Sequence, residues 1–128
     1  MKYYMSKTMT TSFEQTIELV TEALKTEGFG VLTEIDVQKK LKEGLDVEFR
    51  KYRILGACNP KFAHKALQHE DNIGVMLPCN VIVQEAGSNK IEVAAVDPVA
   101  SLMAVDNKEL MEIAREIKVK LERVIALL

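Results

Sequence analysis

Two short segments of the chain carry the same Cys-Asn dipeptide beside a proline. Cys58 and Asn59 come directly before a proline, and Cys79 and Asn80 come directly after one. Proline fixes the backbone at such a corner. A cysteine at the N-terminal end of a helix also has its thiolate favoured by the helix dipole and the free N–H groups. The two segments therefore predict one shared site, which binds a ligand or does redox chemistry, formed by Cys58, Asn59, Cys79 and Asn80.

Each of these residues also has a plain structural explanation. A free cysteine often packs as a small buried hydrophobic residue. Asn59 is well suited to cap a helix that begins at Pro60, and Asn80 is typical of a turn. Three roles therefore stay open: a non-catalytic pocket for a small molecule, a domain that contacts another protein while the corners only fix the ends of the sheet, and a thiol-based redox enzyme or sensor in which Cys58 reacts and Cys79 resolves it.

Neither a metal site nor a cofactor is predicted. Cys58, Cys79, His64 and His69 are residue types that bind zinc, but two histidines five residues apart on a helix point about 140° away from each other. The sequence contains no Walker motif, no Gly-x-Ser-x-Gly and no His-Glu-x-x-His, and its glycines lack the dinucleotide-binding pattern. A non-catalytic role is therefore favoured over an enzyme.

Composition narrows the choice of partners. The 128 residues are 48% hydrophobic and carry a net charge of −2, which fits one globular domain over residues 1–128. An acidic chain lacks the basic surface that nucleic acid requires. No apolar run reaches the length of a signal peptide or a membrane span. We therefore expect no nucleic acid or membrane partner, a cytoplasmic location, and two reduced cysteines.

Alternation and turn residues predict the strands. An alternating segment covers residues 2–9, and a second covers residues 29–35, with Phe29, Val31, Thr33 and Ile35 on one face. A third strand is expected over residues 47–58. The clearest hairpin joins residues 80–86 to residues 90–96 through Gly-Ser-Asn.

Capping residues and apolar stripes predict the helices. Ser12 and Gln15 form a capping-box pattern for a first long helix that ends at Gly28. Shorter helical segments are expected from Asp36 to Leu41, stopped by Gly44, and from Pro60 to about His69. A segment over residues 73–77 is left without a type. A second long helix runs from about Asn107 to the C-terminus, with Asp106 as its cap.

These elements predict an α+β fold. Their order is strand, helix, four strands, helix, with short helices inserted, and tight hairpins favour an antiparallel sheet of about five strands. The two long helices should lie together on one face of this sheet. The apolar residues 124–128 cover more than one side of the last helix, which predicts a second surface, and hence a homodimer.

Three segments, at residues 28–37, 52–60 and 77–81, resemble the bacterial and archaeal family called domain of unknown function 302. The resemblance spans nearly the whole chain. It implies a compact α+β domain with a curved antiparallel sheet, association as a homodimer, and recurrent Cys-Asn positions that correspond to Cys58, Asn59, Cys79 and Asn80. It implies no catalytic role for them, because the family has no established activity.

Overall fold

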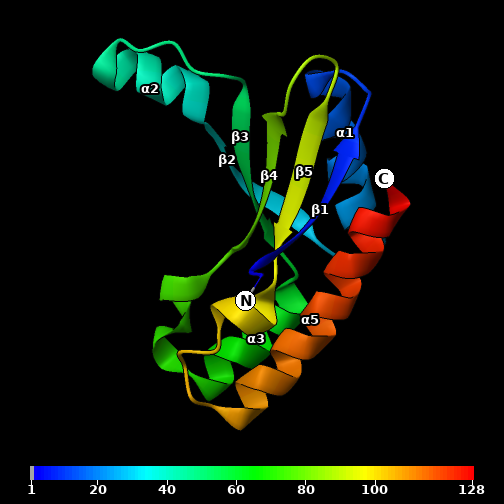
Figure 1. The fold of residues 1–128 in the computed structure, drawn as a ribbon. Helices are drawn as coiled ribbons and strands as arrows, with labels where there is room; N and C mark the ends of the chain where they lie inside the picture. The colour runs from blue at the N-terminus through cyan, green and yellow to red at the C-terminus, as the bar shows by residue number, and fades with distance from the viewer. Residues whose placement is uncertain (1) are drawn as a thin grey trace.

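A five-stranded antiparallel sheet lies at the centre of the structure, a computed structural model that describes residues 2–128 (Figure 1). The strands lie in the order β1-β5-β4-β3-β2, and every neighbouring pair is antiparallel. The α+β class and the sheet of about five strands are confirmed. The strands are β1 (Tyr4–Met9), β2 (Gly30–Asp36), β3 (Tyr52–Cys58), β4 (Cys79–Glu85) and β5 (Ile91–Val96).

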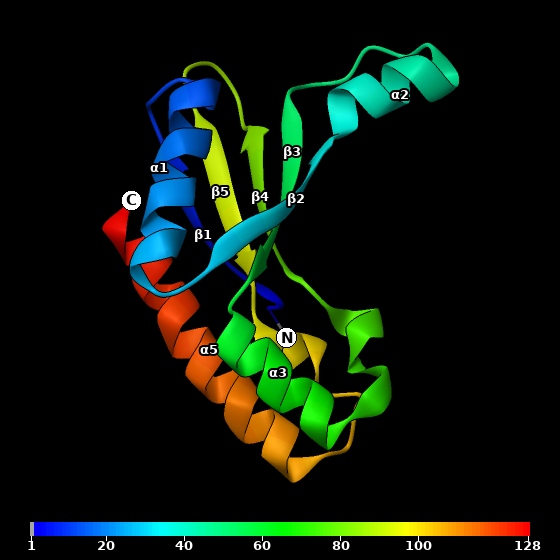
Figure 2. The same cartoon turned by 180° about the vertical axis from the view of Figure 1, so that it is seen from behind.

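Two long helices cover one face of this sheet, as expected from the sequence (Figure 2). They are α1 (Phe13–Thr26) and α5 (Lys108–Leu127), and their apolar stripes pack on the inward side chains of the strands to form the main core. Shorter helical segments complete the described chain. They are α2 (Val37–Leu45), α3 (Pro60–His69), the 3-10 helix η1 (Asp71–Met76) and α4 (Pro98–Ser101).

The helix boundaries follow the sequence with two corrections, at the start of α5 and at the end of α2. The Ser12 hydroxyl accepts from the N–H of Gln15, as predicted. The cap of α5 is Asn107 instead of Asp106, because the Asn107 side chain accepts from the N–H of Leu110. Helix α2 continues past Leu41 and Gly44 to Leu45, and ends where Asp46 takes the left-handed conformation, at φ 52°. The untyped segment is the 3-10 helix η1.

A β-bulge changes the predicted face of β2. The sequence places Val31, Thr33 and Ile35 on one face, but the register moves from Val31 opposite Ala57 to Thr33 opposite Gly56. The extra residue, Leu32, is 67% exposed. Val31 therefore packs against the core, whereas Thr33 and Ile35 lie on the opposite side of the sheet.

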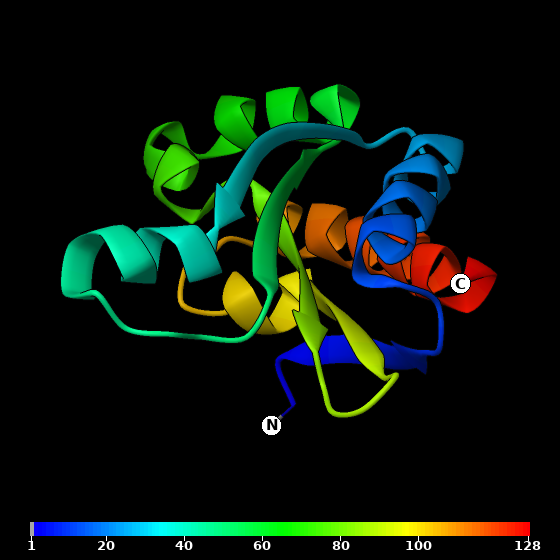
Figure 3. The same cartoon turned by 90° about the horizontal axis from the view of Figure 1, so that it is seen from above.

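The third strand is also shorter than predicted. It begins at Tyr52 instead of residue 47, because the last residue of β2, Asp36, pairs with Arg53 and leaves the residues before Tyr52 without a partner on that side. The segment over residues 37–51 consequently projects from the sheet as an arm that contains α2 (Figures 1 and 3). No residue of α2 is buried.

The chain itself buries part of the apolar C-terminal tail. Val124 and Ile125 are buried in the core between α5 and the sheet. Of the large residues, Leu127 stays 60% exposed. The helix turns Val124 and Ile125 inward and leaves Ala126 and Leu127 exposed, and the homodimer stays a prediction. No helix within residues 2–128 is long and apolar enough to cross a membrane.

Candidate functional site

The two Cys-Asn corners lie side by side at one end of the sheet. Strands β3 and β4 are neighbours, and Ala57 pairs directly with Cys79. Cys58 is the last residue of β3, and Cys79 is the first residue of β4. The antiparallel register therefore brings the two predicted corners together, although 21 positions (79 − 58) separate the two cysteines along the chain.

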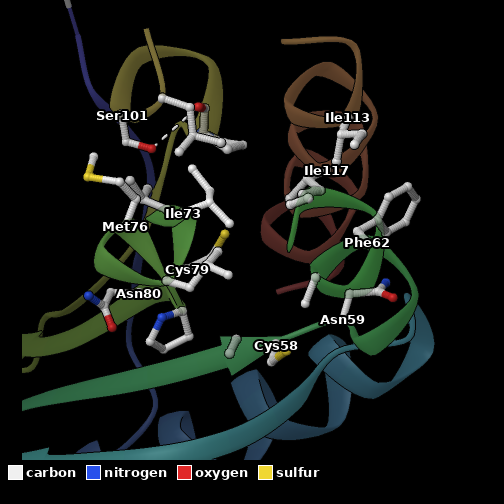
Figure 4. Close-up of a pocket in the computed structure, with 18 of the residues that line it drawn as sticks. Cys58, Asn59, Phe62, Ile73, Met76, Cys79, Asn80, Ser101, Ile113 and Ile117 are labelled. Atoms are coloured by element: carbon white, nitrogen blue, oxygen red, sulfur yellow. Dashed lines mark hydrogen bonds between the residues drawn. The ribbon is translucent and has the colours of Figure 1, made fainter. Parts of the chain in front are cut away.

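A cavity of about 170 Å³ lies against these corners (Figure 4). The ends of β3 and β4 form one side of it, and α3, η1, α4 and α5 enclose the others. Most of its wall is apolar. The buried side chains of the helices around it include Phe62, Ala66, Ile73, Leu102, Ile113 and Ile117.

The volume of the cavity indicates what it can hold. An apolar cavity of about 150 Å³ in another protein stays dry and binds benzene or xenon. Sites for drug-sized molecules usually measure about 300 Å³ or more. The cavity therefore fits a molecule of about one ring, or a short aliphatic chain. An apolar ligand of this kind would not have to displace strongly bound water.

Cys79 points its sulfur atom into this cavity, between Ile73 on one side and Ile117 on the other (Figure 4). Burial, with a smaller contribution from Cys58 nearby, raises the pKa of the Cys79 thiol to about 11. At neutral pH the thiol therefore stays protonated and behaves as a small hydrophobic group.

Cys58 borders the same cavity but points differently. Cys79 shares the inward face of the sheet with its partner Ala57, and successive residues of a strand alternate between faces, so Cys58 belongs to the opposite face. Both cysteines are free. Within residues 2–128, no three His, Cys, Asp or Glu side chains gather closely enough to hold a metal ion, and His64 and His69 are exposed on α3.

Asn59 occupies the N-cap position of α3, but its side chain makes no capping hydrogen bond. Its Nδ2 donates instead to the carbonyl oxygen of Glu27, at 3.1 Å. A Cβ at Gly28 would lie 3.1 Å from the same nitrogen, so the close approach relies on glycine there. Glu27 also pairs with Arg123 of α5. Asn59 thus ties the end of α1 to the corner through one N–H of its amide.

Asn80 is the exposed member of the four. It lies opposite Gly56 on the face of the sheet that the long helices leave uncovered. Asn80 borders both the cavity and a second, open hollow on that face. The Asn80 amide therefore lies at the opening of the cavity, where it can contact both solvent and a bound molecule.

The sequence did not identify the far wall of the cavity. Helix α4 and η1 form this wall, and the sequence showed Asp97-Pro98 only as the end of a strand. Asp97 caps α4 by accepting from Val99 at 2.9 Å, and it also pairs with Lys118 of α5 at 3.0 Å. An Asp-Pro pair is a start signal for a helix, so a signal for α4 was present.

We expect Cys79 to make stability depend on pH in alkaline solution. Its thiol has a pKa of about 11 when folded and 9.0 as its ordinary value. The resulting stabilisation is fully present below pH 9 and is lost as the pH rises towards 11, because the unfolded chain then releases a proton that the folded chain keeps. Over this pH range, the free energy of unfolding of the wild type should fall by roughly 1–3 kcal/mol more than that of Cys79→Ala.

Urea unfolding of the wild type, Cys79→Ala and Cys58→Ala at several pH values measures this difference. Cys58→Ala serves as the matched control and should keep the extra pH dependence. Equal slopes for the wild type and Cys79→Ala would show that the Cys79 thiol is not shielded from water.

Comparisons with known proteins agree with this architecture. The family model of Domain of unknown function DUF302 matches residues 5–128. A crystal structure of an uncharacterized conserved DUF302 protein from Bacillus stearothermophilus superposes with a TM-score of 0.91, at 29% sequence identity, over 99% of this chain and 98% of that one. No curated protein matches the chain. With nearly its whole length matched, the chain belongs to the DUF302 family.

Proposed function

We propose that this protein is a non-catalytic binding domain for a small, mostly apolar molecule, and that it acts as a homodimer in a reducing compartment such as the cytoplasm. The observation that carries the proposal is the apolar cavity of about 170 Å³ at the paired Cys-Asn corners. Burying apolar surface there provides the affinity, at about 25 cal/mol for each Å² removed from water.

The polar groups near the cavity define the rest of the ligand. The Asn59 nitrogen already donates to Glu27, and the Ser101 hydroxyl donates to the carbonyl of Pro98 at 3.3 Å. Asn80 remains at the opening. The preferred ligand is therefore an apolar ring or short chain with one hydrogen-bonding group that reaches Asn80.

Titration with toluene and benzyl alcohol tests this proposal, followed by amide NMR shifts and thermal unfolding. Toluene should shift the resonances of Ile73, Cys79 and Ile117, and should raise the melting temperature as expected for a ligand that binds the folded state. Benzyl alcohol should bind more tightly to the wild type than to Asn80→Ala, while toluene should bind both alike. If neither compound nor xenon perturbs these residues up to its solubility limit, the binding proposal is wrong.

Thiol redox chemistry is the alternative function, and it finds less support. A resolving cysteine must reach the sulfur of its partner, and it reacts through its thiolate. Cys79 keeps its proton, with a pKa of about 11, and the strand register directs the two side chains to opposite faces. Alkylation by iodoacetamide at pH 8 decides between the roles. The redox role requires at least one thiol to react faster than a free cysteine, whereas the binding role requires Cys79 to react slowly and Cys58 to react no faster than a free cysteine.

A further inference from the structure

The uncovered face of the sheet has the composition of an interface. We call this side of the sheet the open face. Its side chains come from alternate positions of the five strands. Seven are apolar or aromatic, and Glu92 is the one charged residue among these strand positions. An antiparallel sheet face that meets water is normally polar. The apolar and aromatic members are Tyr4, Ile35, Tyr52, Ile54, Ile82, Ala94 and Val96.

Aromatic residues concentrate in one hollow on the open face. All three tyrosines of the chain, Tyr3, Tyr4 and Tyr52, line a hollow of about 380 Å³. The charge of Glu92 is satisfied locally, because Gln84 donates to it at 2.9 Å. Tyrosine is enriched at the energetic centres of protein interfaces, and unpaired charges are depleted there.

The projecting arm is a second surface without a partner. Helix α2 has nine residues and no buried side chain, although its apolar residues Val37, Leu41 and Leu45 recur at helical spacing on one side. Leu45 is 69% exposed and Val47 is 41% exposed. A helix this short is marginal in water and takes its stability from packing. The apolar side of the arm therefore needs a surface that residues 2–128 of the same chain do not supply.

We infer that the open face and the arm of one copy pack against the open face and the arm of a second copy. A two-fold axis lets each copy use the same patch, so one contact covers both surfaces that lack a partner. The arm borders the open face and extends away from α1 and α5, so it is placed to reach past the edge of the sheet onto a partner (Figure 3).

An interface of stable size requires both the open face and the arm. Five strands about 4.8 Å apart, each about 20 Å long, give roughly 400–500 Å² per open face, or about 800–1,000 Å² for the pair. Stable interfaces bury about 1,200–2,000 Å². A nine-residue helix about 14 Å long and 10 Å wide covers about 140 Å², so two arms, counted on both sides of each contact, add roughly 560 Å². Only the sum lies within the range of a stable dimer.

This interface gives the proposed homodimer its contact surface and does not depend on the ligand. Asn80 and Val96 line both the cavity and the hollow of the open face. The second copy therefore lies beside the opening of the cavity and contributes to the surroundings of any bound molecule there.

Sedimentation equilibrium of the full chain tests the interface with single charged substitutions. Ile82→Lys places a charge at the centre of the open face, and Leu45→Lys places one on the arm. Each change occurs twice in a symmetric dimer, so each should weaken the dimer at least about 30-fold. Val75→Lys, at an 86% exposed position on η1, is the matched control and should leave the dimer unchanged. Circular dichroism and melting curves confirm that each variant is folded.

The outcomes separate the interface from the function. A wild type that dimerises at micromolar concentration, and loses the dimer in Ile82→Lys and Leu45→Lys alone, supports the interface. A dimer that survives both substitutions uses another surface and overturns it, although the homodimer then stands. A wild type that stays monomeric at 0.2 mM, roughly two hundred times a dissociation constant of 1 μM, overturns both the interface and the homodimer. Toluene binding is judged by its own titration.

Discussion

Replacing Ala66 by leucine should weaken toluene binding at least about 30-fold, which corresponds to about 2 kcal/mol, without destabilising the protein. Ala66 is 4% exposed and lines the cavity. The larger side chain would occupy space that the ligand needs. Because the cavity of about 170 Å³ can accept the added carbons, the usual cost of overpacking a dense core should not arise. The melting temperature should stay the same or rise.

Calorimetric titration of the wild type and Ala66→Leu with toluene measures this effect. Ala126→Leu makes the same change at an exposed position of α5 and should leave the affinity unchanged. Should Ala66→Leu prove poorly folded, Ala66→Val offers a smaller change in the same direction. Undiminished affinity in a folded Ala66→Leu protein would place toluene outside the cavity.

Replacing Gly56 by alanine should lower the free energy of unfolding by about 1–3 kcal/mol, the range typical of overpacking. A Cβ at this position would overlap Thr33 Oγ1 and would lie 2.8 Å from Pro78 Cγ. The threonine can turn away, but the proline ring is rigid and directly precedes Cys79. The substitution should therefore displace the corner as well as weaken the sheet.

Gly30→Ala provides the matched control, because Gly30 also lies in a strand, and nothing lies within 4 Å of the Cβ it would gain. It should change stability by less than about 0.5 kcal/mol. Urea unfolding measures both variants, and toluene titration of Gly56→Ala reports on the corner. If Gly56→Ala is as stable as Gly30→Ala, Thr33 and Pro78 move aside at no cost, and the close packing at Gly56 does not position the corner.

Local signals in the sequence determined the five strands, the longer helices and their order, but not η1 or α4. Ser12 caps α1 as predicted, Asn59 and Pro60 mark the start of α3, and the Gly-Ser-Asn turn joins β4 to β5. Each of these signals acts within a few residues, through one hydrogen bond or one backbone preference. The two long apolar stripes likewise sufficed to place α1 and α5 together on one face of the sheet.

Tertiary structure decided which face the residues of β2 occupy and how long β3 is. The bulge at Leu32 moves Thr33 and Ile35 to the open face, and the departure of the chain into α2 shortens β3 to Tyr52. Nothing in the local sequence marks either event. Both depend on which residue of the next strand offers the matching backbone groups, and that pairing exists only after the strands have met.

The site shows the same division. Residue types and prolines indicated Cys58, Asn59, Cys79 and Asn80, and the register of β3 and β4 brought their corners together. The different roles of the four residues came from their surroundings. Burial keeps the Cys79 thiol protonated, and Cys58 lies on the other face. Asn59 donates to Glu27, and the Asn80 amide is exposed. The cavity is built by helices distant in sequence, and an empty volume is a property of packing that no single segment encodes.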